Sequence, residues 1–288
     1  MKAKDFQLYI FLLPSLLLLL IYIIPITTAF KLSVTDETLI GENYLNPEYV
    51  GLDNFIYMFS DDNFYNSMRV TSLFLIFSAL GQFLLGIVGA NILRGGKGTL
   101  NWITNAAFIL PMAIPEAAAA FMWASMIVPN ETGTMNIISK MFGFSPRNWT
   151  MSLPIISIVF INVWKGMGFA YILFASGIEA ISNEVKEAAK VDGAKGLTMF
   201  LYITIPIIAP TILLFLLLTT IGTLGSFGLV FFLTAGGPAR STELISIYIY
   251  LESFYQYQLG YGAAVGMITL AISVILGIIY LKFLKVKV

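Results

Sequence analysis

The sequence predicts an all-α integral membrane protein with six transmembrane helices. Of its 288 residues, 58% are hydrophobic and only 11% are charged, and the mean hydropathy is +0.86. A soluble domain has about 25% charged residues, so this chain carries less than half of the charge expected for a water-exposed surface. Crossing a bilayer as a helix takes about 20 mostly apolar residues, and the apolar residues here are gathered into segments of that length or more.

The apolar segments follow one another along the chain. The first has no charged residue, and the second is closed by an arginine at either end. The third and the fourth each contain one charged residue, Glu116 and Lys165, and the sixth is followed by lysines. The expected spans are 8–30, 70–93, 102–128, 151–178, 207–235 and 262–281, with a long cytoplasmic segment at 179–206.

A signal peptide is the alternative for the first segment, because Lys2 and Lys4 precede it. Its apolar core is much longer than the about 7–15 residues of signal peptides, and five more spans follow. We therefore expect this segment to remain in the protein as a span.

The basic residues predict the orientation of the chain. Ten Lys and Arg residues lie on the side of the two termini and five on the opposite side, while Lys165 lies within a span. Because cytoplasmic loops carry an excess of Lys and Arg, both termini are expected to be cytoplasmic.

The composition excludes most enzyme chemistry. The chain has no Cys and no His, so thiol nucleophiles, imidazole bases and Cys/His zinc sites are impossible. The 16 basic and 16 acidic residues cancel, which leaves no basic field for nucleic acid. The run from Gly95 to Gly98 is not a phosphate-binding loop, because Gly98 replaces the required Ser or Thr and Asn91 the first glycine. If ATP drives this protein, another polypeptide binds it.

The cytoplasmic segment 179–206 has the pattern of a helical hairpin. Ser182 or Asn183 can cap a short helix, and Asp192 with Gly193 supplies a stop and a turn. Small residues between them form a narrow face that another protein's backbone can approach closely. The residues alone leave an ordinary amphipathic surface hairpin open as the alternative.

The same segment resembles the EAA loop of ABC importer permeases. The matching residues are Glu187, Ala188, Ala189, Asp192, Gly193 and Ala194, followed by Phe200, Ile203, Pro206 and Pro210. In that family the loop forms coupling helices in a groove of the cytoplasmic ATPase. The resemblance implies that the first six of these residues, the coupling residues, contact a partner ATPase dimer that binds ATP and Mg, and that this chain has no cofactor of its own.

Further motifs narrow the resemblance to the maltose/glycerol-phosphate-type carbohydrate permeases. They are Gly51-Leu52-Asp53-Asn54-Phe55, Leu110-Pro111 with Pro115, Asn162-x-Trp164-Lys165-Gly166, Leu233-Thr234-x-Gly236-Gly237-Pro238 with Thr242, Tyr248-x-Tyr250 with Phe254, and Gly260-Tyr261-Gly262-Ala263-Ala264. The larger maltose subunit has two N-terminal spans and a large periplasmic insertion that this sequence lacks. Membership implies a type I importer permease fold in a prokaryotic inner membrane. It also implies a second permease subunit and an extracytoplasmic sugar-binding protein.

Glu116 and Lys165 point to a pathway through the membrane. An ionisable side chain at the centre of a span costs about 2.5–3.5 kcal/mol on insertion scales, so neither side chain is expected to face lipid. Both are expected to face a water-filled cavity or each other. The alternatives are that Glu116 lies at a helix break beside Pro115 and reaches the headgroups, and that Lys165 snorkels, although it is far from either end of its span.

Resemblance to the maltose permease places substrate contacts on three spans. They fall on Met112 and Glu116 in the third, on Asn162, Lys165, Gly166 and Phe169 in the fourth, and on Gly222, Thr223 and Ser226 in the fifth. Polar side chains of these types can bond sugar hydroxyl groups, and a phenylalanine can stack on the apolar face of a sugar ring. Several identities differ from the maltose case, so maltose itself is not implied. Trp164 is expected to pack rather than to contact substrate.

Two glycine patterns lie in the last two spans. Gly222, Gly225 and Gly228 predict either unwound backbone beside a cavity or close helix packing, and both interpretations remain open. Gly262 and Gly266 are expected to form a packing pair.

The leading hypothesis is therefore a permease subunit of an ABC carbohydrate importer, which ATP binding by its partners switches from inward-facing to outward-facing. A self-sufficient secondary transporter or channel with an ion relay at Glu116 and Lys165 is the alternative, but it leaves 179–206 without a purpose. An intramembrane enzyme is disfavoured, because there are no paired acids in the middle of the spans.

Overall fold

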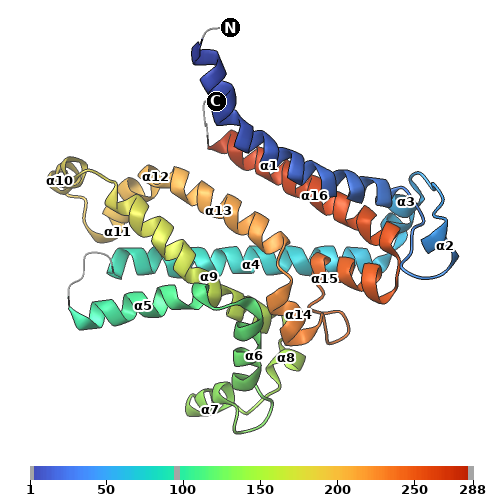
Figure 1. Ribbon diagram of the computed structural model, residues 1–288. Helices are drawn as coiled ribbons and strands as arrows, with labels where there is room; N and C mark the ends of the chain where they lie inside the picture. The colour runs from blue at the N-terminus through green and yellow to red at the C-terminus, as the bar shows by residue number, and fades with distance from the viewer. Residues whose placement is uncertain (1–2, 94–97, 285–288) are drawn as a thin grey trace. The chain divides into compact units, whose positions relative to one another are not determined.

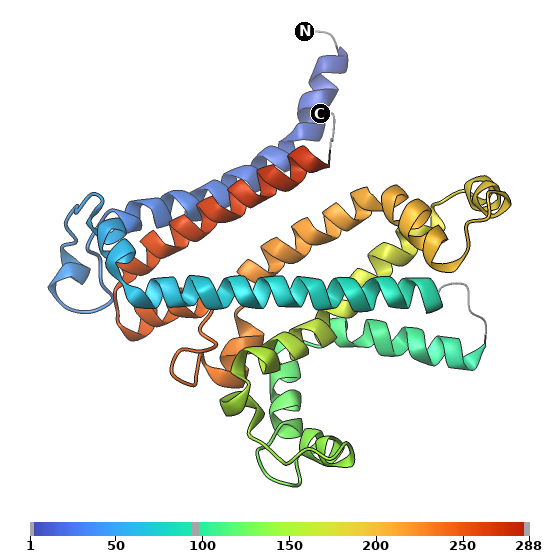
Figure 2. The ribbon, with the colours of Figure 1, turned by 180° about the vertical axis from the view of Figure 1, so that it is seen from behind.

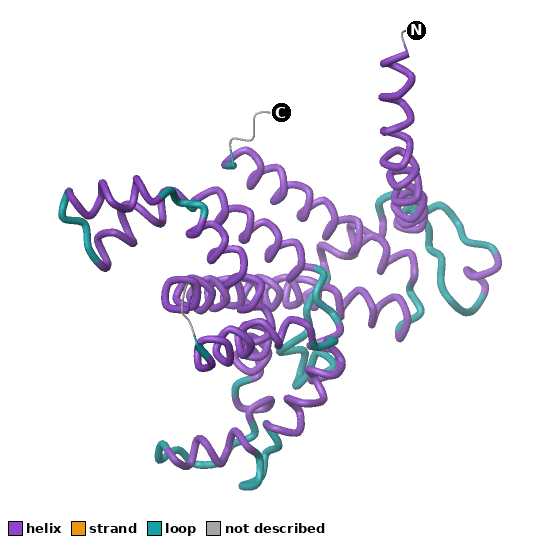
Figure 3. The backbone as a smooth tube through the Cα atoms, turned by 60° about the vertical axis from the view of Figure 1, so that its left-hand side comes forward, coloured by secondary structure: helices purple, strands orange, loops and turns teal. Residues whose placement is uncertain are grey.

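The computed structural model describes residues 3–93 and 98–284, and its regular elements are all helices in these ranges (Figures 1 and 3). An isolated bridge pairs Thr35 with Tyr49. The all-α class predicted from the sequence is confirmed for these residues. Some residues used for orientation, namely Lys2, Arg94, Lys97, Lys285 and Lys287, lie outside the described residues, as does most of the run from Gly95 to Gly98.

The chain divides into two compact units. The first consists of Met1–Tyr65 and Tyr248–Ile272, and the second of Asn66–Ile247 and Ser273–Val288. The two long helices that cross the division, α4 (Asp62–Leu93) and α16 (Leu259–Phe283), therefore contribute to both units.

Helices long and apolar enough to cross a membrane alone are α1 (Ala3–Ser33), α4, α9 (Pro154–Glu179) and α16. The first, second and sixth apolar segments lie inside α1, α4 and α16, and α9 contains all but the first three residues of the fourth. Their apolar residues extend around the whole helix, as expected for helices surrounded by lipid and other helices.

The third apolar segment is not one straight helix. It divides into α5 (Thr99–Ala113) and α6 (Glu116–Met126), which are bent by 113° relative to each other. The break has a local cause, because a proline disfavours helical dihedral angles in the residue before it. Ile114, which precedes Pro115, has an extended backbone with ψ 128°. An uninterrupted helix over 102–128 is therefore wrong, and the predicted alternative of a break at Pro115 is correct.

The fifth apolar segment is interrupted twice. Its elements are α13 (Ala209–Leu224) and α14 (Gly228–Thr234). The apolar helical stretch begins earlier than the predicted boundary at 207, because α11 (Gly196–Met199), the π-helical turn η1 (Phe200–Thr204) and α12 (Ile205–Ile207) precede α13. A bend of 68° separates α12 from α13. A second break at 225–227 includes Gly225, where the unwound-backbone interpretation of the glycine pattern is correct. Close packing is correct at Gly228, where a Cβ atom would lie 2.6 Å from the Glu116 carboxylate.

In the second unit, α9 packs against α5 and α13, and α6 packs against α14. Glycines let the backbones approach closely, because a Cβ on Gly86 of α4 would lie 2.4 Å from the Cβ of Ala170, and one on Gly168 of α9 would lie 2.4 Å from the Phe108 carbonyl oxygen. Figure 2 shows α4 and α5 running along each other, and a Cβ on Gly89 would lie 2.7 Å from Phe108. These glycines therefore permit the close packing of α4, α5 and α9 in the second unit.

A hairpin between α6 and α9 contains α7 (Thr134–Met141) and α8 (Trp149–Ser152). It is organised by one buried amide, since Asn136 is 1% exposed. Its nitrogen lies 3.0 Å from the Asn130 and Arg147 carbonyl oxygens, and its oxygen accepts from the Trp149 indole at 2.9 Å. A single side chain therefore ties both arms of the hairpin together.

In the first unit, contacts between two sequence motifs fix the end of α1. The Asn54 amide of α3 (Asp53–Ser60) donates to the carbonyl oxygens of Ser33 and Thr35 at 3.0 and 2.9 Å. These carbonyls lie at a helix end, where they have no partner within the helix. A Cβ on Gly260 would lie 2.1 Å from the Thr35 oxygen. Two motifs that carried the family resemblance thus act as packing devices. The remaining short elements of the first unit are α2 (Glu42–Leu45), the turn η2 (Leu251–Tyr255) and the second half of α15 (Ile245–Tyr250), which begins in the second unit.

The expected packing pair of α16 is half correct. A Cβ on Gly262 would lie 1.8 Å from the Ser253 hydroxyl, whereas no described atom lies within 4 Å of a Cβ on Gly266. Close approach therefore explains the first glycine and leaves the second without a packing role in this chain.

Candidate functional site

The second unit contains a cavity of about 380 Å³. Its lining residues are Gln82, Glu116, Asn162, Gly166, Phe169, Leu218, Thr219, Gly222, Thr223 and Ser226. Seven of the nine predicted pathway residues are in this lining; Met112 and Lys165 are not. Residues from α4, α6, α9 and α13, which are far apart in the sequence, thus meet around one polar cavity.

Helix periodicity explains how the lining forms. Asn162, Gly166 and Phe169 are four and three residues apart, so they share one face of α9. Thr219, Gly222 and Thr223 have the same kind of spacing on α13. Each helix therefore turns a strip of small and polar residues toward the cavity, together with one apolar side chain, Phe169 on α9 and Leu218 on α13.

Glu116 lies where the two broken segments meet. It is the first residue of α6, and its carboxylate accepts a hydrogen bond from the Leu229 backbone N–H of α14 at 3.2 Å. The first N–H groups of a helix have no partner within the helix, and a negative charge there is favourable. The carboxylate thus accepts a hydrogen bond from the first turn of α14 and also lines the cavity. It lies at a helix break, as one interpretation predicted, and at a cavity, as the other predicted.

Lys165 and Met112 take other positions. Lys165 lies next to Gly166 on α9 and is partly exposed. In the part of the chain that the structure describes, no hydrogen bond or ion pair joins its ammonium group to Glu116. Met112 is 38% exposed on α5. Trp164 packs edge-on against Trp123 with the ring centres 5.4 Å apart, as expected for a packing residue.

Three lining residues were not predicted. Gln82 of α4 is 5% exposed and donates from its amide nitrogen to the Asn162 carbonyl oxygen at 3.1 Å. The buried Thr219 hydroxyl has no hydrogen-bond partner among the described residues, and Leu218 adds apolar surface. A glutamine in the middle of the apolar stretch 70–93 is a signal that could have been used, because polar side chains inside spans usually face protein or a cavity.

The coupling residues lie in and after α10 (Asn183–Val191). Ser182, one of the two predicted caps, accepts from the Val185 N–H at 3.4 Å. The helix ends in a Schellman motif, in which the Ala194 N–H donates to the Ala189 carbonyl at 2.8 Å and the Gly193 N–H to the Lys190 carbonyl at 3.0 Å. This motif requires the left-handed region, and Gly193 has φ +84°.

Exposure divides the coupling residues into two groups. Ala189 is buried and Ala194 is half-buried, and a backbone hydrogen bond joins them at the end of α10. The exposed group is Glu187, Ala188, Asp192 and Gly193. The expected face of small residues is thus split, with Ala189 turned inward, and the exposed group is accessible to another protein.

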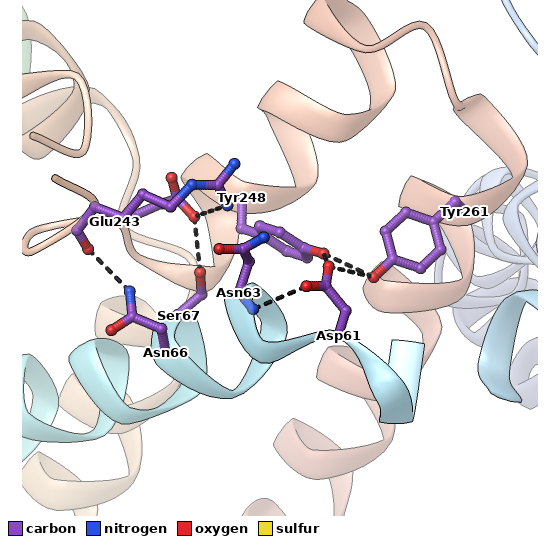
Figure 4. Close-up of polar contacts among 8 residues, drawn as sticks. Asp61, Asn63, Asn66, Ser67, Glu243, Tyr248 and Tyr261 are labelled. Carbon is purple, nitrogen blue, oxygen red and sulfur yellow. Dashed lines mark hydrogen bonds and ion pairs between the residues drawn. The ribbon is translucent and has the colours of Figure 1, made fainter. Parts of the chain in front are cut away.

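Two polar clusters lie near the start of α4 (Figure 4). In the second unit, Glu243 is 2% exposed and accepts from the Ser67 hydroxyl at 3.0 Å and from Arg240 at 3.2 Å. The Asn66 amide donates to the Arg240 carbonyl at 3.0 Å. A buried carboxylate is stable only when it is paired and hydrogen-bonded, so this cluster fixes the loop after α14 onto α4.

The other cluster belongs to the first unit. Tyr248 is fully buried, its hydroxyl donates to Asp61, and the hydroxyl oxygens of Tyr248 and Tyr261 lie 2.7 Å apart (Figure 4). Tyr248 lies outside the spanning segments, and burial followed by its hydrogen bond to Asp61 raises its pKa above the ordinary value. The phenol therefore stays protonated and keeps donating over the physiological pH range.

A polar cavity between broken apolar helices, together with an exposed helix after α9, is the arrangement of a transport permease. Residues 82–285 match the family model described as binding-protein-dependent transport system inner membrane component, and the chain belongs to this family. The resemblance found in the sequence is confirmed. The protein is a permease component of an importer that depends on a binding protein, which does not fit the alternative of a self-sufficient transporter or channel.

Relatives and solved structures agree with this assignment. The chain is 33% identical to the trehalose/maltose transport system permease protein MalF of Thermococcus litoralis, over 98% of this chain and 95% of the relative. It is 30% identical to the sn-glycerol-3-phosphate transport system permease protein UgpA of Agrobacterium fabrum, over 97% and 95%. A chain of the bacterial alginate ABC transporter crystal structure has the same fold, with a TM-score of 0.78 at 24% identity over 96% of this chain and 93% of that chain.

Proposed function

We propose that this permease transports a sugar or sugar derivative into a prokaryotic cell. The relatives are named for trehalose and maltose and for sn-glycerol 3-phosphate, and all three solutes carry hydroxyl groups on adjacent carbon atoms. The cavity fits such a solute, because its amide, hydroxyl and carboxylate groups can bond hydroxyl groups and Phe169 offers an apolar ring face. The observation that carries the proposal is that seven residues chosen by resemblance line this one cavity.

The chain crosses the inner membrane six times in this proposal, with both termini in the cytoplasm. Two observations support the topology. Four helices are long enough to span alone, and the number of spans is six if each of the two bent pairs counts as one. The basic residues are twice as frequent on the side of the termini, which is the pattern of cytoplasmic loops.

The proposed pathway consists of the cavity lining and two residues beside it, Lys165 and Met112. Glu116, Asn162, Gly166, Phe169, Gly222, Thr223 and Ser226 line it directly. Lys165 and Met112 contribute from adjoining positions on α9 and α5, where a small rotation of the helices during transport brings their side chains to the solute. Unwound backbone at 225–227 supports this assignment, since irregular backbone within a membrane protein is tolerated beside cavities.

Energy reaches the chain through α10. The coupling residues contact an ATPase dimer, which binds ATP and Mg. They are Glu187, Ala188, Ala189, Asp192, Gly193 and Ala194. Closure of that dimer displaces α10, and a second permease subunit moves with this one from an inward-facing to an outward-facing state. An extracytoplasmic sugar-binding protein then delivers the solute to the cavity.

Proteoliposomes test the transported class. The complete assembly is reconstituted with ATP inside and binding protein outside, and uptake of labelled maltose, trehalose, glucose and sn-glycerol 3-phosphate is measured. We expect uptake of at least one of these solutes, and none when the binding protein is omitted. Absence of uptake for all four would contradict the proposal.

A further inference from the structure

Gln82 is a buried polar side chain in the middle of an apolar stretch. It lies close to the centre of 70–93 and is 5% exposed. A primary amide at this depth loses its hydrogen bonds to water, and burial without compensation is costly. Gln82 lines the cavity, so its amide lies among the polar side chains of that lining rather than among apolar ones.

The hydrogen bond to α9 fixes the orientation of this amide. Gln82 lies 3.1 Å from the Asn162 carbonyl oxygen. A carbonyl cannot donate, so the atom of Gln82 that faces it must be the amide nitrogen. The amide oxygen is then free to face the cavity that Gln82 lines, and the hydrogen bond to Asn162 uses only the amide nitrogen.

Gly166 leaves the space that this arrangement needs. A Cβ atom at position 166 would lie 2.3 Å from Cδ and Nε2 of Gln82 and 2.6 Å from its Oε1. Non-bonded atoms do not approach so closely, so any side chain at 166 would displace the amide. The glycine at this position is thus explained by Gln82, which lies on a different helix.

We propose that Gln82 is a specificity-determining residue of the cavity. Its amide oxygen accepts a hydrogen bond from a hydroxyl group of the transported solute, while the Asn162 carbonyl and the space above Gly166 hold the amide in place. The Thr219 hydroxyl, which lines the same cavity without a partner among the described residues, supplies a second group of this kind. The inference rests on the proposed function and adds the residue that recognises the hydroxyl pattern.

Four variants separate hydrogen bonding from packing. Gln82→Met keeps the length and volume of the side chain but removes the amide, and Gln82→Ala removes both. Gly166→Ala displaces the amide, and the double variant Gln82→Ala with Gly166→Ala tests whether the glycine acts through Gln82. Ser78→Ala is the control, since Ser78 is equally buried on α4, lies one turn away and is outside the cavity lining.

The measurement is the amount of solute moved per ATP hydrolysed by the complete assembly in proteoliposomes, using whichever of maltose, trehalose, glucose and sn-glycerol 3-phosphate the wild type transports fastest. Loss of one hydrogen bond predicts that the solute moved per ATP hydrolysed falls about fivefold in Gln82→Met and in Gly166→Ala. Gly166→Ala should have less than a twofold effect in the Gln82→Ala background, and Ser78→Ala less than a twofold effect in the wild type. Thermal unfolding of Gln82→Met should match that of the wild type.

If Gln82→Met moved as much solute per ATP as the wild type, the inference would be overturned, because packing alone would then account for Gln82. Full additivity of Gly166→Ala with Gln82→Ala would overturn the role given to Gly166. If the wild type moves none of the four solutes, the proposed function itself fails, which is distinct from a wild type that transports and a Gln82 variant that transports equally well.

Discussion

The carboxylate of Glu116 accepts a hydrogen bond from the backbone N–H of Leu229 at 3.2 Å. This contact joins the beginning of α6 to the beginning of α14, so the breaks in two apolar segments are connected through one side chain. Gly228 makes the approach possible, since a Cβ there would lie 2.6 Å from the carboxylate. A charged residue in a membrane segment thus has a structural partner as well as a place in the cavity lining.

Removing this carboxylate should destabilise the junction of α6 and α14. Glu116→Ala leaves the Leu229 N–H without its acceptor, and we expect a loss of about 1–2 kcal/mol in the free energy of unfolding. Glu116→Gln keeps an oxygen acceptor and should lose less than half as much. Thermal unfolding of the purified chain in detergent, followed by tryptophan fluorescence, measures both. Equal stability of the Ala variant and the wild type would show that the contact contributes nothing.

Gly193 tests the end of the coupling helix. Proline has φ fixed near −65° and cannot adopt the φ of +84° found here, so Gly193→Pro should abolish transport while membrane insertion is retained. Asparagine tolerates the left-handed region, so Gly193→Asn should keep most of the activity. No described atom lies within 4 Å of a Cβ at this position, so the asparagine Cβ fits without a clash, whereas proline also removes the N–H that donates to the Lys190 carbonyl. Uptake by the Pro variant at the wild-type rate would remove this residue from the coupling contact.

How far the sequence predicts the structure depends on the residue type. Pro115 predicts the break of the third segment, because a proline restricts the backbone of the residue directly before it. Ser182 and Gly193 foretell the ends of α10 for the same reason, since caps depend on a few neighbouring residues. Long-range relations are different. Nothing local indicates that Gly166 is small because of Gln82, or that Glu243 is buried beside Ser67.

The candidate site shows the same limit. Family resemblance selected residues on three spans, and helix periodicity then accounts for the strips on α9 and α13. It did not select Gln82 or Thr219, because their contribution depends on how α4 and α13 pack around the cavity. Lys165 was selected as an ionisable group inside a span, yet its place beside the cavity rather than in the lining depends on the rotation of α9, which composition does not determine.

The two glycines of α16 provide a matched pair. A Cβ on Gly262 would meet the Ser253 hydroxyl at 1.8 Å, whereas that on Gly266 meets no described atom. Gly262→Ala should therefore lower stability by about 1–3 kcal/mol through overpacking, and Gly266→Ala should be nearly neutral. Adding Ser253→Ala to the first variant should recover part of the loss. Thermal unfolding of the four proteins measures these effects, and a Gly262→Ala variant as stable as Gly266→Ala would contradict the packing account.

Tyr248 predicts how stability depends on pH. Its pKa is raised above the ordinary value of 10.0 by burial and by the hydrogen bond to Asp61, so the folded chain retains the phenol proton after the unfolded chain has lost it. The stability that this group contributes is complete below pH 10 and is lost as pH rises above it. Tyr248→Phe should cost about 1–3 kcal/mol at neutral pH and should weaken the loss of stability above pH 10. Tyr255→Phe, at an exposed tyrosine, is the control, and identical pH profiles for Tyr248→Phe and the wild type would contradict the assignment.

The dependence of transport on a partner ATPase is the most direct test of the whole account. Solute uptake is measured in proteoliposomes that contain this chain and its partner permease, with the loaded binding protein outside and ATP inside, once with the ATPase dimer and once without it. We predict uptake only in the presence of the ATPase, together with its loss when α10 is altered by Gly193→Pro. Equal uptake in the two preparations would mean that the chain moves solute by itself.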